Sequence, residues 1–122
     1  MADELTLYDT GGNPVVYIDV EDENTIYTWD GTPVAYLSED HIYGFNGKHL
    51  GWFQDGIVWD HDGNRTGYIS DTLPIYASYE SYKSYKSYKP YKSYKEYAPY
   101  QPYKSLSESE VPLLVFMSQG AL

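Results

Sequence analysis

The segment that decides the fold is residues 42–53, which read Ile-Tyr-Gly-Phe-Asn-Gly-Lys-His-Leu-Gly-Trp-Phe. The dipeptide Asn46-Gly47 stands at its centre, between two short stretches of aliphatic and aromatic residues. Such dipeptides accept the positive φ angles of a two-residue hairpin turn, and the flanking residue types favour strands. The segment therefore predicts one β-hairpin with strands of about five residues.

The same hairpin pattern occurs four times in the first half of the chain, around glycines spaced by 19, 16 and 16 residues. The repeated glycines are Gly12, Gly31, Gly47 and Gly63. Four residues before them stand Tyr8, Tyr27, Tyr43 and Trp59, and five after them stand Tyr17, Tyr36, Trp52 and Tyr68. Five residues before them stand Leu7, Ile26, Ile42 and Val58, and four after them stand Val16, Ala35, Gly51 and Gly67. Such regular columns indicate a tandem structural repeat.

The columns predict an aromatic face and an aliphatic face for each hairpin. With a two-residue turn, residues four before and three and five after the glycine share one face, and those five before and two and four after share the other. A three-residue turn with a bulge would shift this assignment. The shrinking column from Val16 to Gly67 indicates a crowded place near a symmetry axis.

Four such hairpins, joined head to tail, can bury a shared core and limit exposed edges by closing on themselves. We therefore expect an all-β fold in residues 1–74, with four tandem hairpins in a pseudo-four-fold closed barrel or flower. On these units, which span about residues 5–70, the chain resembles the four-fold β-flower family of small, mostly bacterial proteins. The resemblance implies the fold alone, because no activity is established for that family.

A tyrosine stands at every third position from Tyr76 to Tyr103, within a low-complexity tract at residues 75–105. A period of three matches polyproline II, with tyrosines, lysines, and serines or prolines on three separate edges. Candidate interaction residues are Tyr82, Lys83, Tyr85, Lys86, Tyr88, Lys89, Tyr91, Lys92, Tyr94 and Lys95. The tract can remain an extended or disordered tail, dock on its own domain or on another chain, bind single-stranded nucleic acid, or serve adhesion.

Charge divides the chain more sharply than its net value of −10 indicates. Residues 1–74 carry −12, the tract carries +4, and residues 106–122 carry −2. An acidic domain is thus joined to a basic arm, which favours docking of the arm on the domain. The same acidity opposes the binding of phosphates.

The apolar run Leu113-Leu114-Val115-Phe116-Met117, in the C-terminal segment 106–122, predicts a short buried strand or an anchor that docks on the barrel. It is too short to span a bilayer. The acidic start Met1-Ala2-Asp3-Glu4 does not match a secretory signal, so we expect a cytoplasmic protein. The absence of cysteine excludes disulfides and thiolate metal sites.

Two groups of residues have the composition of a metal site. Asp60, Asp62, Asn64 and Asp71 have part of the spacing of a calcium loop, but Arg65 replaces its glycine and the hairpin repeat already explains Asp62-Gly63. His41, His49 and His61 occupy different repeat positions, and a small metal enzyme would require His49, His61 and Asp60 to meet. No catalytic motif is present, so we expect no cofactor. The leading hypothesis is a noncatalytic binding or scaffold module that engages a protein or a second copy.

Overall fold

The computed structural model describes residues 4–121 as an all-β barrel with one short helix. Met1, Ala2 and Asp3, which begin the acidic N-terminus, lie outside the described residues, as does Leu122. The strands are β1 (Glu4–Tyr8), β2 (Pro14–Asp19), β3 (Thr25–Thr28), β4 (Pro33–Ser38), β5 (His41–Gly44), β6 (His49–Gln54), β7 (Ile57–Trp59) and β8 (Arg65–Tyr68), followed by helix α1 (Leu113–Ser118).

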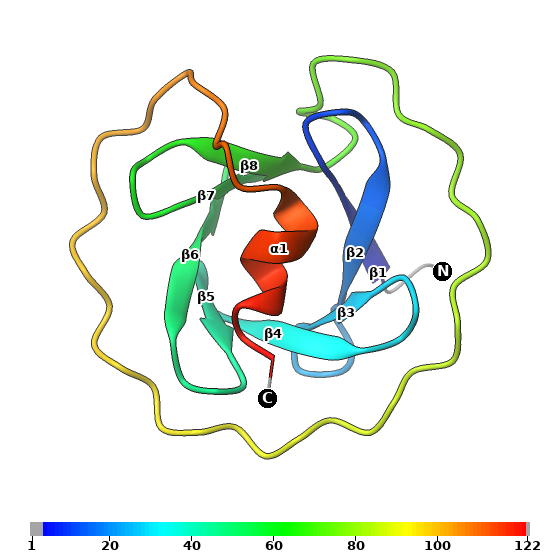
Figure 1. Ribbon diagram of the computed structural model, residues 1–122, viewed down its shortest axis with the longest axis vertical. Coiled ribbons are helices and arrows are strands. Elements are labelled where there is room, and N and C mark those ends of the chain that lie inside the picture. Colours follow the sequence, from blue (N-terminus) through cyan, green and yellow to red (C-terminus); the bar gives the residue numbers. More distant parts are fainter. Residues whose placement is uncertain (1–3, 122) are drawn as a thin grey trace.

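The eight strands pair in sequence order, and all neighbours are antiparallel (Figure 1). The ring closes where Tyr8 of β1 pairs with Tyr68 of β8. Each predicted hairpin is one of the pairs β1–β2, β3–β4, β5–β6 and β7–β8. The predicted closed barrel of four hairpins is therefore confirmed.

The hairpin turns differ from the two-residue type that the sequence predicts. At the first turn the Gly12 amide donates to the Asp9 carbonyl, and the Asp9 amide donates to the Asn13 carbonyl, both at 3.0 Å. These bonds enclose three loop residues, and Gly12 takes the left-handed conformation with a φ of 82°. The same bonds recur in the other three hairpins. The loop is therefore the three-residue type with a bulge, in which only the last residue needs a positive φ.

The bulge moves two predicted columns to the opposite face, those that stand two and three residues after each glycine. It falls between the residues five and four before each glycine. As a result Val34 and Leu50, three residues after their glycines, pack in the aliphatic core instead of among the aromatics. The columns of Leu7 and Tyr8 keep their predicted faces, with aliphatic side chains inside and aromatic rings on the outer wall.

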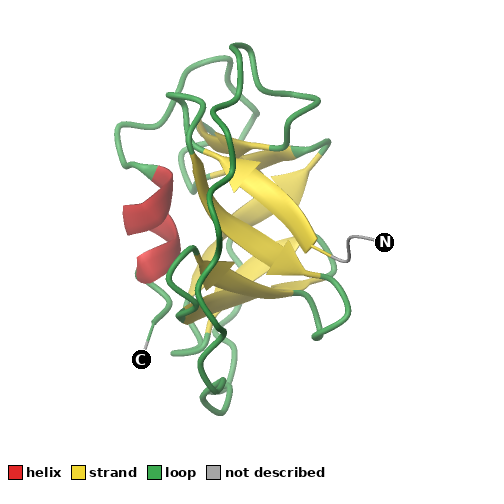
Figure 2. Cartoon of the chain, turned by 90° about the vertical axis from the view of Figure 1, so that its right-hand side faces the viewer, coloured by secondary structure: helices red, strands yellow, loops and turns green. Residues whose placement is uncertain are grey.

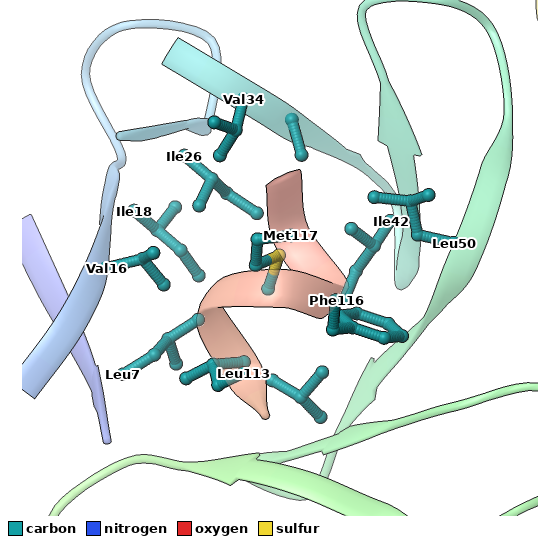
Figure 3. Packing of buried hydrophobic residues seen from close by; sticks show 12 residues of the cluster. Leu7, Val16, Ile18, Ile26, Val34, Ile42, Leu50, Leu113, Phe116 and Met117 are labelled. Atoms are coloured by element: carbon teal, nitrogen blue, oxygen red, sulfur yellow. The ribbon is translucent and has the colours of Figure 1, made fainter. Parts of the chain in front are cut away.

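Helix α1 fills one mouth of the barrel (Figures 1 and 2). Its residues Leu113, Phe116 and Met117 are buried among the aliphatic columns (Figure 3). The segment is a helix, so the buried strand that the sequence offers as one alternative is wrong, and the apolar anchor is correct. The three buried residues have the helical spacing i, i+3 and i+4, which places them on one face of the helix. Close neighbours explain the small residues of the shrinking column. A Cβ on Gly51 would overlap the Trp59 carbonyl oxygen and lie 2.8 Å from the Phe116 ring, and one on Gly67 would lie 2.9 Å from Leu113.

The tyrosine tract encircles the barrel before the chain reaches α1 (Figure 1). We call residues 76–105 the belt. It passes the four hairpin turns in order and then leads through residues 106–112 into the helix. The chain therefore forms the barrel, wraps around it and plugs its mouth.

Candidate interaction site: the tyrosine belt

The belt is attached to the barrel by its backbone at every ninth residue. The amides of Ser78, Ser87, Glu96 and Ser105 donate to the carbonyls of the four turn glycines, at 2.8, 2.9, 2.9 and 2.8 Å. Nine residues are three tyrosine periods, so each quarter of the barrel is matched by three periods of the belt. The two internal repeats are therefore in register.

The turn glycines are required by the belt as well as by the turn. A Cβ on Gly31, Gly47 or Gly63 would overlap the carbonyl oxygen of Tyr85, Tyr94 or Tyr103, and one on Gly12 would lie 2.7 Å from that of Tyr76. The close approach of the belt backbone thus excludes any side chain at these positions. The belt has a second set of backbone bonds, from Ser84 to Trp29 and from Ser93 to Phe45.

The lysine edge of the belt faces the barrel. Lys83 contacts Glu4 at 2.9 Å, and Lys86 contacts both Glu4 and Asp19. Lys89 lies 2.6 Å from Asp22. Further around the barrel, Lys92 is paired with Glu23, Lys95 bonds Ser38, and Lys104 is paired with Asp55.

The same lysines lie over the aromatic outer wall. The Lys92 ammonium is 4.2 Å from the centroid of the Tyr36 ring, and the Lys83 ammonium is 4.9 Å from Tyr17 and 5.0 Å from Trp29. Cation–π attraction at such distances adds to the ion pairs. The aromatic columns of the repeat therefore form the surface on which the lysine edge docks. Further cation–π contacts are made by Lys86 with Tyr17 and Tyr27, by Lys95 with Tyr43 and by Lys104 with Trp59.

The ion pairs shift the pKa values of their members. Burial alone would raise the pKa of Glu4, but hydrogen bonds from Lys83 and Lys86 outweigh it, and this pKa is lowered. Burial alone would lower the pKa of Lys86, but its bonds to Asp19 and Glu4 raise it well above the usual range. The charged forms of both partners are therefore favoured in the docked belt.

The tyrosine edge of the belt faces solvent. All ten belt tyrosines are at least 96% exposed, whereas the six other tyrosines of the chain, in the barrel, are at most 7% exposed. The belt members are Tyr76, Tyr79, Tyr82, Tyr85, Tyr88, Tyr91, Tyr94, Tyr97, Tyr100 and Tyr103. The candidate interaction residues therefore fall into two groups: the lysines contact the barrel, and the tyrosines face solvent.

Three of the four residues with the calcium-like spacing, Asp60, Asp62 and Asn64, belong to the last hairpin turn. The Asp60 carboxylate accepts hydrogen bonds from the amides of Asp62 and Asn64, both at 2.9 Å, and so closes the last turn. Asp9 makes the corresponding bonds in the first turn. Within residues 4–121, no three side chains of His, Asp or Glu are grouped so that they could hold a metal ion.

The three histidines meet, although their repeat positions gave no reason to expect it. His49 Nε2 lies 2.9 Å from His41 Nδ1, and His49 Nδ1 lies 2.9 Å from His61 Nε2. Asp60, the proposed third ligand, is instead bonded within its own turn. The meeting depends on the bulge, which pairs His49 with Tyr43 on the outer wall and which the sequence alone does not fix.

The barrel with a docked belt defines a class of all-β repeat proteins in which a closed ring of hairpins carries its own extended arm. The chain matches the 4-fold beta flower protein family over residues 5–116 and belongs to it. The match covers the four hairpins, the whole belt and most of α1, which extends well beyond the hairpin units that carry the resemblance in the sequence. No match was found among curated proteins or among solved structures. In residues 4–121, no helix has the length and apolar character needed for a bilayer crossing.

Proposed function

We propose that this protein is a noncatalytic scaffold that binds another protein through the ring of tyrosines on its belt. The observation that carries the proposal is the exposure of all ten belt tyrosines beside the burial of the other six. Exposed aromatic side chains in such number are unusual on a monomeric protein and are typical of binding surfaces. Tyrosine combines a large apolar ring with a hydroxyl that can bond a polar partner.

The docked belt lowers the cost of binding. A free arm would lose conformational entropy when it met a partner, whereas this backbone is already held at the four turn glycines. Adjacent tyrosines along an extended threefold path are roughly 9 Å apart, which allows several rings to engage one partner at once. The belt therefore supports multivalent contact.

Charge favours a basic protein as the partner. The six belt lysines contact the barrel, and the chain carries a net charge of −10. Arginine and lysine side chains of a partner would be attracted by this charge and could stack on the exposed rings. The alternative of single-stranded nucleic acid binding has less support, because it requires the same lysines to leave their carboxylates and rings.

The absence of catalysis is a further part of this proposal. It is supported by the sequence, which holds no recognised catalytic motif. A small metal enzyme is disfavoured because its candidate ligand Asp60 is committed to the last hairpin turn.

Replacing belt tyrosines tests the proposal. We would change Tyr82, Tyr88, Tyr91 and Tyr97 to serine and measure the affinity for a labelled peptide rich in arginine and glycine. The expected result is at least a tenfold loss of affinity with an unchanged melting temperature. The matched variant, with phenylalanine at the same four positions, should retain most of the binding if the rings carry it.

The same titrations separate the alternatives. Equal affinity of the serine variant and the unmodified protein would contradict the proposal. Binding of a single-stranded oligonucleotide that disappears when the six belt lysines become glutamine would favour the polyanion alternative. Concentration-dependent mass in sedimentation, lost in the serine variant, would instead assign the ring to self-association.

A further inference from the structure

The three histidines form a continuous hydrogen-bonded chain of imidazoles. His41 is on β5, His49 begins β6, and His61 lies in the turn between β7 and β8. Both links measure 2.9 Å, and the chain runs from the exposed His61 through the buried His49 to the half-buried His41. Since His49 is only 2% exposed, both of its ring nitrogens depend on these neighbours for hydrogen bonds.

The histidine chain lies in the quarter of the barrel where the lysine edge of the belt is interrupted. Every third belt residue from Lys83 to Lys95 is lysine, but the next two positions are Ala98 and Gln101. We call belt residues 94–103, which run from the Gly47 turn to the Gly63 turn, the histidine quarter. Its side chains that bond the barrel are those of Lys95, Glu96 and Gln101.

Two aromatic rings, two carboxylates and one ammonium group lie around the three histidines. Tyr43 on β5 has its ring centroid 5.1 Å from that of His49, and Trp52 on β6 has its centroid 4.8 Å away. Glu96 of the belt accepts a bond from the His49 amide at 2.7 Å. Asp40, before β5, lies 3.7 Å from His41 Nε2. The Lys95 ammonium of the belt lies 5.4 Å from the Tyr43 ring centroid.

The number of ring hydrogens limits the positive charge that the three linked histidines can hold. Each of its two links can contain one hydrogen, and each end can carry one more. Three neutral imidazoles bring three hydrogens, so one added proton gives four and leaves every link intact. That proton can sit at the His61 end, facing solvent, or at the His41 end, facing Asp40. A fifth hydrogen would place two N–H groups against each other and must break a link.

We propose that the chain of His41, His49 and His61 is a one-proton site that controls the histidine quarter, and that its second protonation releases this quarter of the belt from the barrel. The proposal is independent of what the tyrosine ring binds. It requires only that the belt in this quarter depends on the position of His49.

The connection between His49 and the belt is direct. The His49 amide donates to Glu96 Oε2, and the Tyr43 hydroxyl, beside the His49 ring, donates to the Glu96 carbonyl at 3.2 Å. Burial, together with charges on His61 and His41, lowers the pKa of His49 to about 4, so a charged His49 is strongly disfavoured where it lies. When a link breaks, the two facing N–H groups must move apart, and we infer that the displacement of His49 weakens the bond from its amide to Glu96.

The parts of the belt whose lysines pair with barrel carboxylates should release at a lower pH than the histidine quarter does. The pKa values of Glu4 and Asp22 are lowered by their hydrogen bonds from belt lysines, and for Asp22 also from Tyr27, although burial acts in the opposite direction. These carboxylates keep their charge after the second proton has entered the histidine chain. The belt should therefore open in one quarter before it opens elsewhere.

Amide exchange measured by NMR on the full chain tests this order. The reporters are the amide of Glu96, which donates to Gly47, and the amide of Ser87, which donates to Gly31. Between about pH 6.5 and pH 4.5, we expect the protection factor of Glu96 to fall roughly tenfold or more while that of Ser87 stays constant. Nitrogen shifts of the imidazoles should report uptake of the first proton before this loss.

Two variants identify the titrating groups. In His41→Gln/His61→Gln, glutamine amides can still bond His49 but cannot take a proton, so the loss should move to about pH 4. In Glu96→Gln, the belt carboxylate can no longer titrate, and the loss should remain in its original range.

Three results would overturn the proposal. The first is simultaneous loss of protection at Glu96 and Ser87, which would indicate global acid unfolding. The second is an unchanged loss in the double glutamine variant. The third is its disappearance in Glu96→Gln, which would assign the pH dependence to the belt carboxylate.

Discussion

The lysine edge and the tyrosine edge of the belt repeat with the same period of three but have opposite surroundings. Lysines contact carboxylates and aromatic rings of the barrel, whereas every tyrosine beside them is at least 96% exposed. The lysine edge is thus explained by docking, and the tyrosine edge is not needed for the fold. The lysine edge therefore stabilises the docked belt, and the exposed tyrosine edge is the surface to which our proposal assigns binding.

The largest expected effect comes from pushing the belt away from the barrel. In Gly31→Ala the new Cβ would overlap the Tyr85 carbonyl, and the residue has a φ of 90°. Left-handed strain, the lost bond from Ser87 and the weakened lysine contacts together should lower the free energy of unfolding by roughly 4 kcal/mol. Urea denaturation measures this loss.

Gly11→Ala is the matched control for that substitution. Gly11 has no positive φ, and its Cβ would meet only side-chain atoms, at 3.3 and 3.4 Å. We expect a change within about 0.5 kcal/mol. Equal destabilisation by both alanines would show that the belt does not approach the turn glycines.

The second effect is the pH dependence of stability. His49 has a pKa of about 4 in the folded protein, below its ordinary value of 6.5, so the unfolded chain binds this proton more readily. The stabilisation is complete above about pH 6.5 and is lost as the pH falls toward 4, by about 3 kcal/mol in total. Urea midpoints across this range measure it, and His49→Gln should flatten the slope. A slope that remains unchanged in this variant would exclude His49 as its source.

The third effect concerns single lysines on the inner edge. Lys86→Met removes pairs with Glu4 and Asp19 and should cost about 1 kcal/mol, reduced at high salt because the lysine is partly exposed. Lys104→Met should cost less, since its partner Asp55 has a side chain that is 80% exposed. Thermal melts at two salt concentrations compare the two variants, and the reverse order would contradict the observed contacts.

The smallest effect on stability is expected at the outer edge. Tyr88→Ser should change the free energy of unfolding by less than about 0.5 kcal/mol, because the ring has no buried surface to lose. Tyr27→Ser, by contrast, removes a ring that is 2% exposed and its 2.7 Å bond to Asp22, and should cost several times more. Similar costs in denaturation experiments would remove the distinction between the two sets of tyrosines.

The repeated columns predicted the barrel because each carries a strong local signal. Gly47 and its counterparts fix the turns, and the alternation of Ile42 and Tyr43 fixes the inner and outer faces. The sequence does not decide the bulge, since the same dipeptides suit both a two-residue and a three-residue loop. The helix at Leu113 was ambiguous for a similar reason, because a short apolar run fits a strand or a helix.

The site was less predictable than the fold. Period and charge indicated a three-edged basic arm, but which edge faces inward depends on the acidic and aromatic wall that only the closed barrel assembles. The meeting of His41, His49 and His61 depends on the bulge and on a contact between neighbouring hairpins. Such contacts leave no periodic signal in one sequence.

The most direct test of the docked belt is amide exchange along residues 76–105 at neutral pH. A docked belt predicts protection of the amides that donate to barrel carbonyls, which belong to Ser78, Ser84, Ser87, Ser93, Glu96 and Ser105. It also predicts rapid exchange at the exposed Tyr79 and Tyr88, whose amides bond no backbone group among residues 4–121. Uniformly rapid exchange through the tract would contradict the account, because it would mean that the arm is free of the barrel.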